Sequence, residues 1–182
     1  MKIIFLDRDG VINRHPGFGD YVKDCREFYF LSGAKEAIRK LTEKEFNIYI
    51  ISNQAGIAKK IFSKSKLKDI TKKMLEEIKE SGGKIKGVYY CTHRKEDNCF
   101  CRKPKIGSIQ KAIKKKRIDL RDAYFIGDSP RDIETGKNAG CKTVLVLSGE
   151  TKEEDITNLF PKPDFIAKNL LEATKIILGE NK

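Results

Sequence analysis

The 182-residue sequence lacks any apolar run that approaches the roughly 18–20 residues needed to cross a bilayer. It also lacks the layout of a secretory signal, because its first apolar run is short and meets Asp7 at once. We found no internal repeat, low-complexity tract or second domain in the sequence. We therefore expect one cytoplasmic domain over residues 1–182, long enough to bury a full-sized core.

The charge of the chain is strongly one-sided, with 38 Lys and Arg against 26 Asp and Glu and a formal net charge of +12. Such an excess favours an anionic partner, either nucleic acid or a phosphorylated metabolite. The alternative is a lysine-rich solvated surface, and the lysines are indeed scattered along predicted helices rather than collected in one tail. Charge alone leaves both interpretations open.

Short β-type runs alternate with amphipathic helical stretches along the chain. The predicted strands lie at 3–6, 48–51, 88–90, 124–126, 143–147 and 165–166. The predicted helices lie at 34–44, 66–81, 106–116, 131–139, 153–159 and 170–178. This alternation indicates an α/β fold with a parallel sheet and helices on both faces. Two segments interrupt it: an aromatic, glycine-rich stretch over about 14–30, expected to form a flap, and a polar cysteine loop over 91–104.

Carboxylates follow two of the predicted strands. Asp7 and Asp9 come directly after the first strand, Asp128 follows the fourth, and Asp132 lies one helical turn further on. Because ligands bind at the carboxyl edge of open α/β sheets, we expect Asp7, Asp9 and Asp128 to meet there. Three carboxylates in one cleft repel, and Mg²⁺, which prefers oxygen ligands, would resolve the repulsion. The alternative for Asp128 is that it only caps the following helix.

Polar and basic residues complete the set needed for phosphoryl transfer. Ser52, Asn53 and Gln54 follow the second strand, where hydroxyl, amide and backbone N–H groups suit phosphate oxygens, although Ser-Asn is also a routine helix cap. Lys103 supplies a positive charge that can steady a nucleophilic carboxylate and a transferring phosphoryl group.

Asp7-x-Asp9-Gly10, Ser52-Asn53-Gln54, Arg102-Lys103-Pro104 and Gly127-Asp128 together resemble the motifs of the haloacid dehalogenase superfamily of phosphohydrolases, in order and over nearly the whole chain. The resemblance implies a Rossmann-like fold without a large cap. It also implies that Asp7 is the nucleophile that forms an aspartyl-phosphate. Asp9 would be the general acid and base, and would contact Mg²⁺ through its backbone carbonyl.

The cysteine loop predicts a second metal site. Four donors fall within eleven residues in the pattern C-x-H-x5-C-x-C: Cys91, His93, Cys99 and Cys101. This is a known donor set for closed, structural zinc. A disulfide or free thiols are the alternatives, and a cytosolic setting disfavours the disulfide. Cys25 and Cys141 are expected to be plain small residues.

The same loop resembles the zinc-containing branch of the superfamily, which holds heptose 1,7-bisphosphate 7-phosphatases and histidinol-phosphate phosphatases. The segment Asn53-Gln54-Ala55-Gly56-Ile57-Ala58 favours the heptose enzymes, which leaves histidinol phosphate as the alternative substrate. By this resemblance Arg102 would contact the substrate. Heptose enzymes often carry a basic residue where this chain has Ser129. The candidate substrate-binding residues are Ser52, Asn53, Gln54, Arg102 and Arg14.

We therefore expect a Mg²⁺-dependent phosphomonoesterase with structural zinc, acting as a monomer on a phosphorylated small molecule. A hypothesis from another class is a zinc-stabilised, basic nucleic-acid-binding module without catalysis. It accounts for the charge and the cysteine loop, but it leaves the acid pair Asp7 and Asp9 unexplained.

Overall fold

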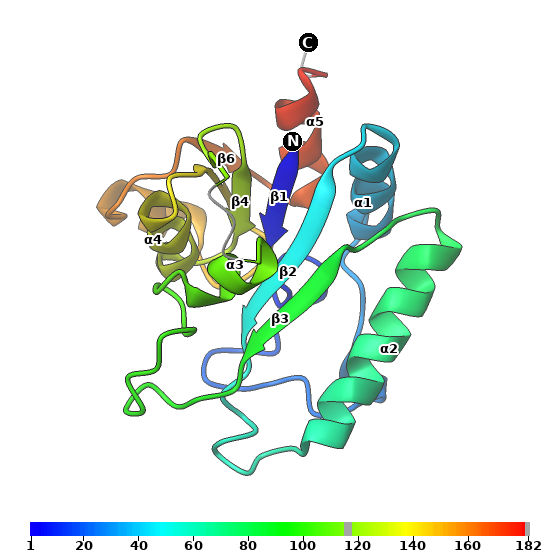
Figure 1. Cartoon of the computed structure of the whole chain (residues 1–182), viewed down its shortest axis with the longest axis vertical. Coiled ribbons are helices and arrows are strands. Elements are labelled where there is room, and N and C mark those ends of the chain that lie inside the picture. Colours follow the sequence, from blue (N-terminus) through cyan, green and yellow to red (C-terminus); the bar gives the residue numbers. More distant parts are fainter. Residues whose placement is uncertain (115–117, 181–182) are drawn as a thin grey trace.

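The computed structural model describes residues 1–114 and 118–180. Its strands form one parallel six-stranded sheet in the order β3-β2-β1-β4-β5-β6 (Figure 1). The strands are β1 (Ile3–Leu6), β2 (Asn47–Asn53), β3 (Gly87–Cys91), β4 (Tyr124–Gly127), β5 (Lys142–Val146) and β6 (Phe165–Ala167). All six correspond to predicted strands, which confirms the α/β architecture.

The first strand lies in the middle of the sheet. In β1 every residue is fully buried, and Leu6 pairs with Ile50 of β2 on one side and Ile126 of β4 on the other. Successive side chains alternate between the two faces, so Ile4 and Leu6 join one apolar cluster while Ile3 and Phe5 join another. Each such side chain stabilises the fold by about 1.5–3 kcal/mol relative to an exposed one. The end of β1 is therefore held firmly.

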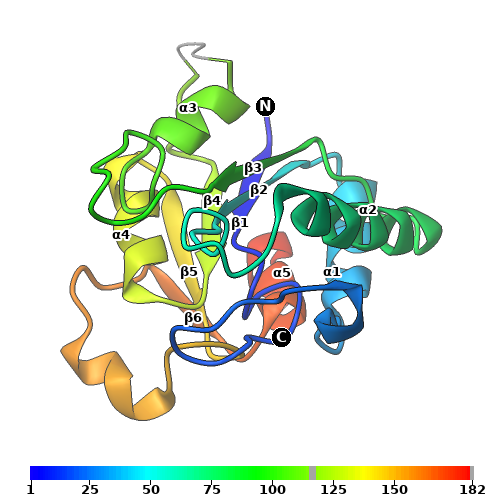
Figure 2. The ribbon, with the colours of Figure 1, turned by 90° about the horizontal axis from the view of Figure 1, so that it is seen from below.

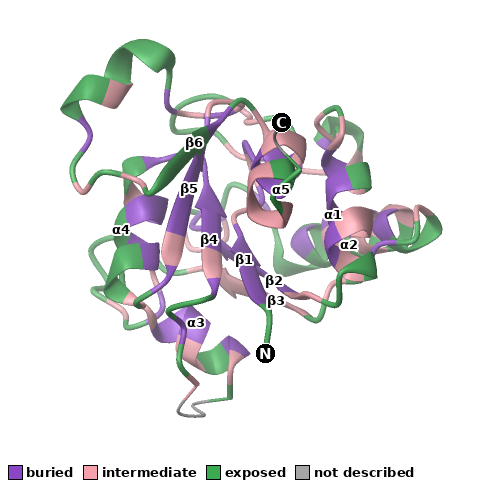
Figure 3. Cartoon of the chain, turned by 90° about the horizontal axis from the view of Figure 1, so that it is seen from above, coloured by how far each residue is buried: buried purple, intermediate pink, exposed green. Residues whose placement is uncertain are grey.

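Helices cover both faces of the sheet (Figures 2 and 3). The cluster that contains Ile4 and Leu6 packs under α1 (Ala34–Glu43), α2 (Lys64–Glu80) and α5 (Leu170–Leu178). The opposite face carries α3 (Gly107–Ala112) and α4 (Pro130–Asn138).

The second helix shows why these segments are helical. In α2 the buried residues Leu67, Ile70, Met74 and Ile78 recur at the helical period and form one stripe. Ser63 caps its amino end by accepting a hydrogen bond from the Lys66 amide. At the other end Gly82 adopts a φ of +83°, a left-handed conformation that ends the helix.

Two predicted helices differ from the structure. The segment expected at 106–116 ends as a helix at Ala112; Lys114 has a φ of +54°, and residues 115–116 of that prediction lie outside the described part of the chain. The segment expected at 153–159 is a short 3₁₀-helix, η2 (Glu153–Asn158), and none of its six residues is buried. A short 3₁₀-helix, η1 (Cys25–Glu27), also forms inside the flap segment.

The two segments that interrupt the alternation both extend from the carboxyl edge of the sheet, at the bottom of Figure 1. The segment 14–30 leaves and returns at one point, since the Arg14 amide donates to Tyr29 O and the Leu31 amide to Ile12 O. The loop after β3 returns beside β2. Within residues 1–114 and 118–180, no helix has the length and apolar character needed to span a membrane.

Candidate active site

The predicted nucleophile stands at the end of the central strand. Asp7 is fixed by its amide, which donates to Ile126 O of β4 at 3.0 Å. Its Oδ1 accepts the Arg8 amide at 2.7 Å and lies 2.9 Å from Lys103 Nζ. The Asp7 side chain is 13% exposed, so it faces a cleft rather than open solvent. The geometry brings the acid of β1 and the lysine of the cysteine loop together, as the sequence predicts.

Two further acids reach the same point from β4 and α4. Asp128 is buried, and its Oδ2 accepts the Glu150 amide at 2.7 Å. Asp132 is completely buried; its Oδ1 lies 2.6 Å from Lys103 Nζ and its Oδ2 accepts Ser129 Oγ at 2.7 Å. One carboxylate oxygen each from Asp7, Asp128 and Asp132 lies within 4.8 Å of the others. We call these three residues the carboxylate cluster.

Asp132 is a site residue that sequence reasoning did not select. Its signal was present, because it follows Asp128 by four residues and so lies one helical turn further on. It was obscured by a second role, since Asp132 also forms a capping box with Ser129 at the start of α4. Ser129, at the position where the family resemblance favours a basic residue, instead takes part in the cap of α4.

Glycine allows the chain to approach Asp128 closely. Gly10 has a φ of +80°, and a Cβ on it would lie 2.0 Å from Asp128 Oδ2. A Cβ on Gly149 would lie 1.8 Å from the same oxygen. Both positions therefore require a residue without a side chain.

The carboxylate cluster is electrostatically crowded. Burial raises the pKa of Asp7, an effect that Lys103 opposes and that Asp132 and Asp9 reinforce. Burial, followed by Asp132 and Asp7, raises the pKa of Asp128 well above its ordinary value. Burial also acts on Asp132, but Lys103 outweighs it and lowers the pKa of that carboxyl. Three ionised carboxylates and one ammonium carry a summed charge of −2, which a hard dication with oxygen ligands would neutralise.

Asp9 has a different environment from its neighbour. It lines the cleft, but its carboxylate accepts hydrogen bonds from Asn13 Nδ2 at 2.9 Å and Gln54 Nε2 at 2.8 Å and forms an ion pair with Arg8. Burial tends to raise the pKa of Asp9, but Arg8 and the two amides outweigh it and lower that pKa. The side chain of Asp9 thus stands apart from the carboxylate cluster.

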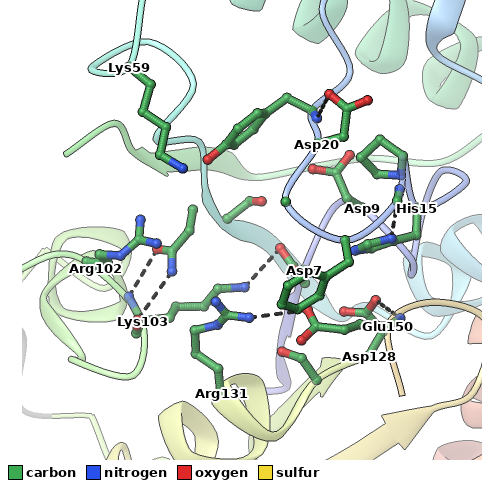
Figure 4. A pocket seen from close by; sticks show the side chains of 18 residues that line it. Asp7, Asp9, His15, Asp20, Lys59, Arg102, Lys103, Asp128, Arg131 and Glu150 are labelled. Atoms are coloured by element: carbon green, nitrogen blue, oxygen red, sulfur yellow. Dashed lines mark hydrogen bonds and ion pairs between the residues drawn. The ribbon is translucent and has the colours of Figure 1, made fainter. Parts of the chain in front are cut away.

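The cleft above these acids has a volume of about 240 Å³. Figure 4 shows Lys103 pointing to Asp7 at its floor, with Lys59, Arg102 and Arg131 around it. The flap contributes its tip to the cleft, and His15 is part of the lining. The charged and polar residues of the lining include Asp7, Asp9, Ser52, Asn53, Lys59, Arg102, Lys103, Asp128, Arg131 and Glu150.

The predicted substrate-binding residues divide into two groups. Ser52, Asn53 and Arg102 line the cleft. Gln54 is completely buried and contacts Asp9 and Ser52 instead, and Arg14 lies with its guanidinium 5.8 Å from the Tyr29 ring. Neither Gln54 nor Arg14 is among the described residues that line the cleft.

Asn53 joins the second strand to the cysteine loop. Its Oδ1 accepts the Lys103 amide at 3.1 Å, and its Nδ2 donates to Lys103 O at 3.2 Å. The Asn53 side chain therefore fixes the backbone that carries the lysine, rather than only offering its amide to the cleft.

The cysteine loop gathers its four donors into one group, which we call the thiol–imidazole cluster: Cys91, His93, Cys99 and Cys101. The Sγ atoms of Cys91 and Cys99 are 3.5 Å apart, and His93 Nδ1 lies 3.7 Å from Cys91 Sγ and 3.3 Å from Cys101 Sγ. A tetrahedral zinc ion, bonded at about 2.3 Å to sulfur and about 2.0–2.1 Å to nitrogen, places neighbouring donors about 3.5–3.8 Å apart. The sulfur separations exceed a disulfide bond of about 2.05 Å, so the donor set fits zinc and not a disulfide.

Comparison with known proteins gives a consistent result. A family model described as HAD-hydrolase-like matches residues 100–173. A D-glycero-beta-D-manno-heptose-1,7-bisphosphate 7-phosphatase from Neisseria meningitidis is 34% identical over 183 residues, covering 100% of this chain and 97% of that protein. The corresponding alpha-heptose enzyme from Photorhabdus laumondii is 32% identical, covering 97% of each chain.

Solved structures agree with the sequence comparison. The D,D-heptose 1,7-bisphosphate phosphatase of B. bronchiseptica, in a complex with magnesium and phosphate, has a TM-score of 0.90 with 31% identity and covers 100% of both chains. The phosphatase of that name from Burkholderia thailandensis has a TM-score of 0.71 with 27% identity, covering 98% of this chain and 99% of the other.

Proposed function

The chain belongs to the heptose 1,7-bisphosphate 7-phosphatase family of the haloacid dehalogenase superfamily, and we propose that it removes the 7-phosphate of D-glycero-D-manno-heptose 1,7-bisphosphate through a phosphorylated Asp7. As a member of that family it is a phosphoric monoester hydrolase. The observation that carries the proposal is the position of the Asp7 carboxylate at the floor of the cleft, 2.9 Å from Lys103 Nζ and clustered with Asp128.

The reaction proceeds in two halves. Asp7 attacks the phosphorus, the bond from phosphorus to the sugar oxygen breaks, and Asp9 gives a proton to that oxygen. Water then attacks the phosphorus of the aspartyl-phosphate, Asp9 takes its proton, and inorganic phosphate and the free Asp7 carboxylate result. Lys103, with Ser52 and Asn53 beside it in the cleft, would hold the oxygens of the transferring group.

Two metal ions belong to the proposal. Asp7 and Asp128, with the backbone carbonyl of Asp9, would hold Mg²⁺, which when bound neutralises charge between the nucleophile and the phosphate. The thiol–imidazole cluster would hold structural zinc. With all four ligand positions filled by protein, zinc would fix the loop that carries Arg102 and Lys103 and would activate no water.

The charge around the mouth of the cleft supports a bisphosphate. Its acids are already paired, because Glu150 lies 3.2 Å from Arg131 and Asp20 lies 3.0 Å from Lys23. Lys59 and Arg102 add two further positive charges to the lining. This end of the cleft suits a second phosphate better than the cationic side chain of histidinol phosphate.

We further propose that the chain acts as a single domain and a monomer in the cytoplasm, with residues 14–30 as a flap over the cleft. Nucleic acid is not a proposed partner, because the cationic groups described above line a narrow cleft with a carboxylate floor.

The experiment that tests the proposal is a comparison of kcat/KM by phosphate release, with Mg²⁺ present, on both anomers of heptose 1,7-bisphosphate and on histidinol phosphate. We expect a preference of at least about 100-fold for a heptose bisphosphate, since a second charged contact is lost with the other compound. Equal or better turnover of histidinol phosphate would reject the substrate assignment, and no turnover of either compound would reject both.

A further inference from the structure

Arg8 lies between the two active-site acids in sequence, yet its side chain points into the interior. It is completely buried and is not among the described residues that line the cleft. Removing a guanidinium from water costs several kcal/mol unless partners compensate for the loss. The contacts of Arg8 should therefore show what this residue does.

Most of those contacts are to one carboxylate. Arg8 Nε donates to Asp9 Oδ1 at 3.1 Å, and Nη2 donates to both oxygens of Asp9 at 2.9 Å. Asn13 binds Oδ1 of the same group and Gln54 binds Oδ2. The planar fork of Arg8 thus fixes the plane of the Asp9 carboxylate, and the two amides fix each oxygen separately.

The other side of the guanidinium faces an aromatic ring of the sheet. Its Cζ lies 5.7 Å from the centre of the Tyr90 ring in β3. The Tyr90 hydroxyl and Thr71 Oγ1 of α2 are 3.0 Å apart and share a hydrogen bond. Among the described residues Arg8 Nη1 has no hydrogen-bond partner, which leaves Tyr90 as a second support for the cation. Arg8 is therefore held between a fixed aromatic ring and Asp9.

We propose that Arg8 is a positioning residue whose fork holds the plane of the Asp9 carboxylate and aims this carboxylate, at the edge of the cleft, at the leaving oxygen. The inference rests on the proposed function, in which Asp9 protonates that oxygen.

The dependence of the rate on the leaving group tests this role. A sugar alkoxide requires a proton in order to leave, whereas p-nitrophenolate leaves without one. For Arg8→Lys, which keeps the charge and loses the fork, we expect the first-turnover rate on a sugar phosphate to fall about 10- to 100-fold with KM little changed. On p-nitrophenyl phosphate that rate should change by less than about 3-fold. Rapid-quench kinetics with Mg²⁺ present measures both rates and separates leaving-group departure from the later hydrolysis.

Variants of the aromatic support provide a second measurement if Arg8→Lys fails to fold. Tyr90→Leu removes the ring and should give the same selective loss at about 3- to 10-fold. Tyr90→Phe is the matched control, because it keeps the ring and should leave both substrates near the wild-type rate.

An equal loss on both substrates in Arg8→Lys and in Tyr90→Leu would overturn the inference, because a merely structural defect slows both. The proposed phosphatase would survive that outcome, since its own tests are substrate preference and the loss of activity without Asp7.

Discussion

Two clusters of potential metal ligands lie close to each other and differ in almost every property. The carboxylate cluster offers hard oxygen donors from three separate positions in the chain and opens on the cleft. The thiol–imidazole cluster offers soft donors from a single loop, with all four positions filled by protein. The two clusters therefore suit different tasks. An open site with crowded charge suits the binding of a reacting phosphate, whereas a closed site suits a metal ion that fixes the conformation of a loop.

The two clusters meet along three consecutive residues. Cys101 belongs to the thiol–imidazole cluster, Arg102 lines the cleft, and Lys103 pairs with Asp7 and Asp132. The thiol–imidazole cluster can therefore influence the chemistry through the position of this short segment. Three substitutions separate the contribution of each cluster.

The largest effect is expected at the nucleophile. Asp7→Asn should lower kcat by about 10⁴-fold or more, since the other carboxylate beside Lys103, that of Asp132, is completely buried and cannot replace Asp7 as the nucleophile. The thermal midpoint should stay within about 3 °C, because the change keeps the size of the side chain and removes one charge from a crowded cluster. Phosphate release and a thermal melt measure the two effects.

Asp122→Asn is the control for Asp7→Asn, because the Asp122 side chain is 97% exposed. It should leave both activity and melting unchanged. Near-normal hydrolysis by Asp7→Asn would remove the proposed nucleophile and with it the chemical role of the carboxylate cluster.

The next largest effect is expected at the thiol–imidazole cluster, where stability should fall more than chemistry. Cys101→Ser removes one of four zinc ligands, so bound zinc should drop and the free energy of unfolding should fall by at least about 2 kcal/mol, or about 4–8 °C in Tm. Activity should fall only about 10-fold, through displacement of Lys103. Metal analysis, melting and phosphate release give the three values.

Cys25→Ser is the matched control, since Cys25 is a half-buried cysteine in η1 outside the cluster. A Cys101→Ser protein that keeps its melting temperature and metal content would show that the cluster holds no structural zinc.

The smallest of the three effects is expected where Asn53 of β2 holds the segment that joins the two clusters. Asn53→Ala removes both hydrogen bonds to the Lys103 backbone, which should cost about 1–3 kcal/mol of stability. It should also lower kcat about 10-fold, because the lysine loses its exact distance from Asp7. Denaturant unfolding and steady-state kinetics measure these changes while zinc stays bound.

Asn47→Ala, at the opposite end of β2, removes only an exposed 3.4 Å hydrogen bond to Lys2 O and should be nearly neutral. If Asn53→Ala were equally neutral in rate, Asn53 would not transmit the position of the cysteine loop to the site.

The fold was largely predictable from the sequence, because the spacing of apolar residues indicates which side chains are buried. The run Ile3–Leu6 is apolar at every position, as a strand buried on both faces requires. The prediction of an α-helix from apolar spacing was wrong in a segment that buries few side chains. The segment 153–159 is short, just under two helical turns, so its spacing does not distinguish an α-helix from the observed 3₁₀-helix.

A site residue was predictable from the sequence where it directly follows a strand. It was less predictable where the residue that it contacts lies far away in the sequence. The position of Asp7 follows from the strand before it, but nothing local indicates that Gln54 turns to Asp9 and away from the cleft. The sequence placed Asp132 only one helical turn after Asp128; in the structure it completes the capping box of Ser129, and only the fold brings Lys103 to its other oxygen. Contacts between distant segments are not encoded in spacing.

The close approach of Gly10 and Gly149 to one carboxylate oxygen limits how this chain can evolve. The two glycines are far apart in sequence and perform no chemistry, yet any β-carbon at either place would collide with Asp128. Mutational drift in the segment after β5 is therefore restricted as tightly as in the segment after β1, for reasons of space rather than reactivity. A homologue that lost either glycine would have to move its carboxylate as well.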